Sequence, residues 1–170
     1  MNSVVIYGSR HGTTRKVAEA IAGELGRHGS VQLMSADEAP DFLPMPTDLV
    51  VIGGPTETHR MMEPMTKFFD RVPYGAMTGI AAAGFDTRVR WPRFLSGSAG
   101  MGIVERLRSR GAEVIAKEES FFVTGVSPKH VEAPVLEPGE LERAAEWAAS
   151  LAANVDSTER ELAAPASKRP

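Results

Sequence analysis

Short apolar runs alternate with segments of helical periodicity along most of the chain. An unbroken apolar run predicts a strand covered on both faces, and apolar residues repeating every three or four positions predict an amphipathic helix. The predicted strands are 4–7, 31–34, 48–53, 79–85 and a fifth at 113–116 and 120–124, with room for a break around Lys117. The predicted helices are 13–28 and segments around 65–72, 101–111 and 141–151. The proline-containing stretch 35–46 should be irregular.

This alternation predicts an α/β fold. Strand–helix units in series give a doubly wound, five-stranded parallel sheet with helices on both faces. We expect one domain at 1–155. The segment 156–170 should be a disordered tail, because polar residues, Pro165 and Pro170 replace the periodic pattern there.

The segment 4–18, VVIYGSRHGTTRKVA, joins the first strand to the first helix through a loop rich in hydroxyl groups. The first amides of a helix have no partner inside it, and the helix dipole favours an anion there. The hydroxyls of Ser9, Thr13 and Thr14 can donate further hydrogen bonds, and Gly12 permits close approach of the backbone. The segment therefore predicts a phosphate-binding loop.

This loop resembles that of the flavodoxin family, which reads Ser/Thr-x-Thr-Gly-x-Thr after the first strand. The corresponding residues here are Ser9, Arg10, His11, Gly12, Thr13 and Thr14. His11 stands where the family usually has a hydroxyl, and a histidine N–H can replace that donor. The patterns GGPT at 53–56, FDTR at 85–88 and SFFVTG at 120–125 extend the resemblance, in a bacterial single-domain branch, over nearly all of 1–153.

The resemblance implies the strand order 2-1-3-4-5, with FMN (flavin mononucleotide) at the carboxyl ends of strands 1 and 3. Flavodoxin is itself the type example of this rule. The loops after strands 3 and 4 would then hold the flavin ring, with Trp91 and next Phe85 as the best stacking aromatics. The implied ring contacts come from Pro55, Thr56, Glu57, Thr58, Phe85, Asp86, Thr87 and Trp91. His59 or Met61 could pack near the ring, although Met61, Met62 and Met65 are better interpreted as core. Asp86 could instead cap a turn.

The composition of the chain excludes several kinds of functional site. The chain has no cysteine, so disulfides and thiolate sites are excluded, and its net charge of −3 predicts no large nucleic-acid surface. No apolar run approaches the ~20 residues of a membrane span. The first strand begins close to Met1, which leaves no room for a signal peptide, so we expect a cytoplasmic protein. The sequence shows no metal-ligand spacing, no carboxylate cluster for a phospho-receiver and no P-loop lysine.

The leading hypothesis is a flavodoxin-like FMN protein that carries electrons, docking a flavin or iron–sulfur reductase and an acceptor enzyme. One alternative is an NAD(P)H-dependent FMN reductase of a small acceptor such as a quinone. Another is a flavin-free interaction module, favoured by His11. The cluster of Arg88, Arg90 and Arg93 is interpreted as a solvated loop rather than an anion site. The sequence leaves the oligomeric state, the redox partners and the reduction potential open.

Overall fold

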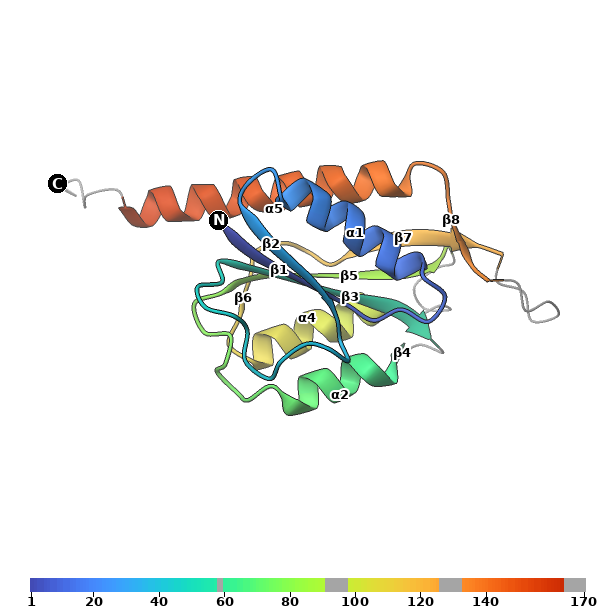
Figure 1. Ribbon diagram of the computed structural model, residues 1–170, viewed down its shortest axis with the longest axis horizontal. Coiled ribbons are helices and arrows are strands. Elements are labelled where there is room, and N and C mark those ends of the chain that lie inside the picture. Colours follow the sequence, from blue (N-terminus) through green and yellow to red (C-terminus); the bar gives the residue numbers. More distant parts are fainter. Residues whose placement is uncertain (58–59, 91–97, 126–132, 164–170) are drawn as a thin grey trace.

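The computed structural model describes residues 1–57, 60–90, 98–125 and 133–163. A mostly parallel sheet lies between two layers of helices, with α1 and α5 on one face and α2 and α4 on the other (Figure 1). The helices are α1 Thr13–Leu25, α2 Glu63–Arg71, α4 Ala99–Ser109 and α5 Glu140–Ala163. The strands are β1 Asn2–Tyr7, β2 Ser30–Ser35, β3 Leu49–Glu57, β4 Arg60–Met61, β5 Ala81–Val89, β6 Glu113–Val114, β7 Glu119–Thr124 and β8 Val135–Leu136.

The topology confirms the predicted fold class and strand order. Within the described residues the strands follow the order β2-β1-β3-β5-β7-β8. The first five are parallel neighbours, and β8 is added antiparallel to β7 at the edge. The predicted fifth strand is divided as expected, since β6 and β7 pair with successive parts of β5 on either side of Lys117.

The central strands extend further toward their carboxyl ends than the sequence predicts. β3 continues to Glu57 and turns back as β4, while β5 continues to Val89. Pairing between β3 and β5 reaches Pro55 and Thr87, and pairing between β5 and β7 reaches Val89 and Val123. The residues predicted as loops at 54–57 and 86–89 are therefore strand. Their backbone hydrogen-bonding groups face neighbouring strands on both sides over 85–87.

The last helix also differs from the prediction, because α5 continues to Ala163 where a disordered segment was expected from 156. The sequence STERELA contains several strong helix formers, which explains the continuation. The domain boundary at 155 stays a prediction.

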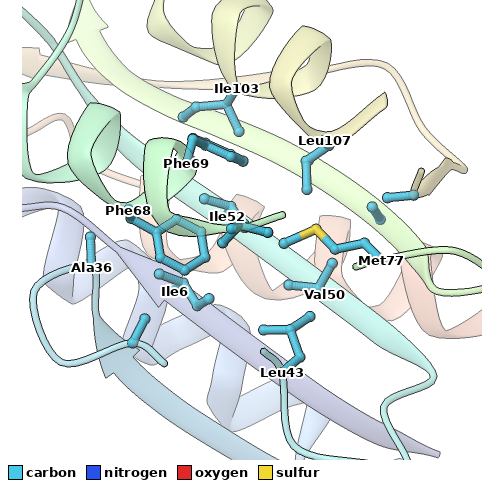
Figure 2. Close-up of a cluster of buried hydrophobic side chains, with 14 of the residues drawn as sticks. Ile6, Ala36, Leu43, Val50, Ile52, Phe68, Phe69, Met77, Ile103 and Leu107 are labelled. Atoms are coloured by element: carbon cyan, nitrogen blue, oxygen red, sulfur yellow. The ribbon is translucent and has the colours of Figure 1, made fainter. Parts of the chain in front are cut away.

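Two apolar clusters fill the space between the sheet and the helices. On the α2 and α4 face, Ile6, Val50 and Ile52 pack beneath Phe68 and Phe69, as Figure 2 shows. Met62 and Met65 are buried in this cluster and Met61 packs at its edge, which confirms their interpretation as core residues. The second cluster lies between the sheet and the α1 and α5 layer, and it contains Phe85, Phe121 and the partly buried Trp147.

The backbone of Gly53 lies close to the Phe85 ring of the second cluster. A Cβ on Gly53 would lie 2.1 Å from the ring of the fully buried Phe85, a separation that atoms do not tolerate. The aromatic ring therefore occupies the volume that any other residue at position 53 would need.

We expect Gly53→Ala to lower the free energy of unfolding by about 1–3 kcal/mol, because the ring must shift within a packed core. The matched control is Gly23→Ala on the exposed side of α1, where an added Cβ meets nothing within 4 Å. That change should raise the free energy of unfolding by about 0.5–1 kcal/mol, as alanine replaces glycine in a helix. Urea unfolding of both variants measures the difference, and equal stabilities would contradict the packing described.

Candidate functional site

The loop 9–12 turns the chain from β1 into α1. Gly12 adopts φ of +87°, a left-handed conformation that glycine accepts without strain, and it precedes the first helical residue. The Ser9 hydroxyl accepts a hydrogen bond from the Gly12 amide at 3.0 Å. This bond uses an oxygen lone pair and leaves the Ser9 hydroxyl proton available to another acceptor.

The first turn of α1 presents amides toward this loop. The Lys16 amide makes the first backbone bond of the helix, to the Gly12 carbonyl at 3.1 Å. The amides of Thr13, Thr14 and Arg15 precede that bond and so have no carbonyl of the helix to pair with. Arg10 and His11 are exposed on the loop. The segment 9–14 thus combines helix-terminal amides with positive side-chain charge, an arrangement suited to an anion.

Thr14 does not face open solvent, although it belongs to this loop. It is 1% exposed, and its hydroxyl lies 2.7 Å from the hydroxyl of Thr87 on β5, which is 3% exposed. Either oxygen can be the donor. This contact joins the start of α1 to the carboxyl end of β5.

Asp86, the neighbour of Thr87, lies on the opposite face of the sheet, since alternate residues of a strand point to opposite faces. Its side chain is fully buried, and its Oδ2 accepts hydrogen bonds from the Thr56 hydroxyl at 3.0 Å, the Ser98 hydroxyl at 2.7 Å and the Gly100 amide at 3.0 Å. Thr56 in turn accepts a bond from the Ala99 amide at 2.9 Å. One carboxylate therefore fixes the end of β3 and the start of α4 to β5.

The second oxygen of Asp86 is in a different environment. Oδ1 is buried and has no hydrogen-bond partner among the described residues, and the Arg88 guanidinium Nε lies 3.8 Å away. Arg88 donates instead to the Ser120 hydroxyl at 3.1 Å. Burial of Arg88 contradicts its interpretation as part of a solvated loop.

Arg90, the second arginine of the cluster, lies over Phe122. The Arg90 guanidinium stacks 3.9 Å above the Phe122 ring centroid and donates to Glu137 at 2.7 Å. Its hydrogen bond with Glu137 raises the pKa of Arg90 above the ordinary value. Arg90 is exposed, as expected, but it is ion-paired, and Arg93 lies outside the described residues.

Several residues that the sequence predicted as contacts of the flavin ring have side chains that are buried or already bonded within the protein. Phe85 is fully buried against Phe121 and Trp147, with ring centroids at 5.8 and 6.2 Å, so it cannot stack on a ligand. The side chains of Asp86 and Thr87 are occupied by contacts within the protein, because the predicted loop continues as a paired strand. Pro55 and Thr56 are half-buried at the end of β3. Glu57 is the last residue of β3, whereas Thr58, His59 and Trp91 lie outside the described residues.

Ser98 and Gly100 are residues that the prediction of the site missed. Ser98 caps α4 by accepting from the Met101 amide at 3.3 Å, in addition to its bond to Asp86. A serine ahead of a helix is a recognisable cap in the sequence. Its link to Asp86 could not be recognised, because nothing local connects the two positions.

The described part of the chain offers neither a metal centre nor a membrane-spanning helix. No cluster of three histidine, aspartate or glutamate side chains there could hold a metal ion. Over the same residues, no helix combines the length and the apolar character that crossing a bilayer requires.

The fold and the 9–14 loop together define a doubly wound α/β domain with a turn suited to an anion after its first strand, which is the architecture of flavodoxins. The family model described as a flavodoxin domain matches residues 4–78. This match agrees with the resemblance that the sequence motifs indicated.

Solved structures show the same fold across most of the chain. A flavodoxin from the domain Archaea is 22% identical, covers 92% of this chain and 99% of its own, and superimposes with a TM-score of 0.70. Flavodoxin 1 from Bacillus cereus is 21% identical, covers 89% of this chain and 97% of its own, and superimposes with a TM-score of 0.71. Rubredoxin oxygen:oxidoreductase from Desulfovibrio gigas is 17% identical with a TM-score of 0.70, covering 96% of this chain but 37% of its own. No curated protein sequence matches the chain significantly.

Asp86 provides a test of the polar framework. We expect Asp86→Ala to lower the free energy of unfolding by about 3 kcal/mol, because the buried Gly100 amide and the half-buried hydroxyls of Thr56 and Ser98 lose their acceptor. Asp86→Asn should cost less, since an amide oxygen can still accept from Thr56, Ser98 and Gly100. Chemical denaturation gives the two energies, and hydrogen exchange of the Gly100 amide reports whether the start of α4 is released. A variant that keeps both the stability and the Gly100 protection of the wild type would contradict this role.

Proposed function

We propose that this chain binds FMN, with the phosphate on the 9–14 loop, and carries electrons between partner proteins. The observation that supports the proposal most directly is the geometry of that loop. Gly12 turns the chain so that the first amides of α1, the Ser9 hydroxyl and the exposed Arg10 and His11 belong to one short segment. The match of residues 4–78 to a flavodoxin domain supports a flavin as the molecule that carries the phosphate.

The residues present fit the phosphate end of FMN better than the ring end. Ser9 has a hydroxyl proton to donate, and the α1 amides and dipole suit a dianion. Thr56 and Asp86 are already bonded to each other, so their side chains frame the neighbouring loop rather than offer free groups to a ring. Bound FMN would supply one- and two-electron redox chemistry, and the protein would hold it and limit its access to solvent.

Other parts of the proposal follow from the same assignment. The electron donor would be a flavin or iron–sulfur reductase and the acceptor a second enzyme. Thr58 and Trp91 remain proposed ring contacts, the domain is proposed to end at 155, and the cytoplasm is the proposed location. A flavin-free interaction module is the second candidate. It is favoured by the inward-facing side chains of Phe85, Asp86 and Thr87.

The absorbance spectrum of the purified protein, before and after addition of FMN, separates these two candidates. We expect a bound flavin spectrum and stoichiometric uptake. A colourless protein that takes up no FMN would overturn the proposal and favour the interaction module.

The double variant Ser9→Ala/Thr14→Ala should weaken FMN binding by about 1.5–3 kcal/mol for each phosphate hydrogen bond lost. The matched control is Thr78→Ala/Ser109→Ala, which removes two hydroxyls that donate to the carbonyls of Gly75 and Arg106. Flavin fluorescence titration gives both affinities. If the two double variants bind FMN alike, the phosphate is not on the 9–14 loop.

The carrier and reductase hypotheses differ in their need for a partner. We expect no turnover when the FMN-loaded protein is mixed with NAD(P)H and a quinone, and rapid reduction once a flavodoxin reductase is added. Stopped-flow absorbance at the flavin band measures both rates. Turnover without an added reductase would favour the hypothesis that this protein is itself an NAD(P)H-dependent reductase.

A further inference from the structure

We propose that Thr87 is a positioning residue of the phosphate site, acting through Thr14 rather than on the flavin ring. The inference rests on the proposed function, and it moves Thr87 from the ring contacts to the opposite end of the ligand. Its basis is the 2.7 Å contact between the two buried hydroxyls.

The two hydroxyls together have two protons, and the contact between them uses one. Whichever hydroxyl donates within the pair, the other retains a proton for a further acceptor. When Thr87 donates to Thr14, the retained proton is that of Thr14, which belongs to the 9–14 loop. An anion on the loop favours this direction, because a hydroxyl that accepts one bond becomes a stronger donor of the next.

Because the pair is buried, water cannot readily take the place of the Thr87 hydroxyl as the partner of Thr14. Thr14 is 1% exposed and Thr87 3% exposed, so bulk water does not compete for either hydroxyl. β5 fixes the backbone of Thr87 through its pairing with Pro55 and with Phe121 on its two sides. The Thr14 hydroxyl is therefore held by a group on a strand that is paired on both sides rather than by a loop.

The alternation of side chains along β5 indicates that Thr87 acts at the phosphate end and not on the flavin ring. Phe85 and Thr87 share one face of β5, and Phe85 on that face is covered by protein. Thr87 contacts the start of α1, where the phosphate would lie. A hydroxyl in this position should distinguish ligands by their phosphate and not by their isoalloxazine ring.

The test compares FMN with riboflavin, which has the same ring and no phosphate, on the full-length protein. Thr87→Val should weaken FMN five- to tenfold and leave riboflavin affinity within twofold of the wild type. Thr87→Ser, which keeps the hydroxyl, should restore FMN binding. Thr66→Val on α2, which removes a hydroxyl bonded to the Met62 carbonyl, is the matched control and should change neither affinity.

A double-mutant cycle with Thr14→Val shows whether Thr87 acts through Thr14. In the Thr14→Val background, Thr87→Val should change FMN affinity by less than twofold. The doubly substituted protein also replaces both hydroxyls with methyl groups of the same shape, so it should fold even if Thr87→Val alone is unstable.

Equal weakening of FMN and riboflavin, an unchanged FMN affinity in Thr87→Val, or independent effects in the cycle would each overturn the inference. A wild-type protein that binds neither flavin would overturn the proposed function instead. Inorganic phosphate, followed through the amide resonances of Thr13 and Thr14, would then decide the role of Thr87. A lower phosphate affinity in Thr87→Val than in the wild type would support the positioning role of Thr87, and an equal affinity would overturn it.

Discussion

The carboxyl end of β5 holds a helix on each face of the sheet through one buried polar side chain per face. Thr87 contacts Thr14 at the start of α1, and Asp86 contacts Gly100 near the start of α4. Both helices begin at this edge, so their amino ends, with their unpaired amides and positive dipoles, are fixed by neighbouring residues of one strand. The proposed site depends on this constraint, because the position of the 9–14 loop follows from the position of α1.

The constraint also explains why the central strands are long. Asp86 and Arg88 point to the α4 face, where an apolar side chain would be expected in a buried strand. They are tolerated because Thr56, Ser98 and Ser120 supply hydrogen-bond partners there. A buried carboxylate without such donors would cost several kcal/mol, so extension of β5 and ordering of the start of α4 depend on each other.

The sequence was sufficient for the fold and for the position of the first loop. Apolar runs such as 48–53 and the periodicity of α1 are local signals, and the alternation of the elements predicts a parallel sheet. The order of the strands was implied by the resemblance to flavodoxin. The ends of β3 and β5 were not predictable in this way. The segment FDTRV has three consecutive polar residues, Asp86, Thr87 and Arg88, which is typical of a loop. Partners distant in the sequence make it a buried strand, such as Thr56, 30 positions from Asp86, and Thr14, 73 positions from Thr87.

The same contacts decide how a flavin could be held. Hydrogen-bonding groups already satisfied within the protein offer little to a ligand, since a new bond to them must replace an old one. The hydroxyls of Thr56 and Thr87 and the Oδ2 atom of Asp86 are in this condition, whereas the amides of Thr13, Thr14 and Arg15 have no helical acceptor. In a protein that binds FMN as proposed, the phosphate would therefore supply most of the polar affinity. The side chains of β5 would contribute little to holding the ring. This division explains how a family-like phosphate loop can coexist with a β5 end whose side chains face inward.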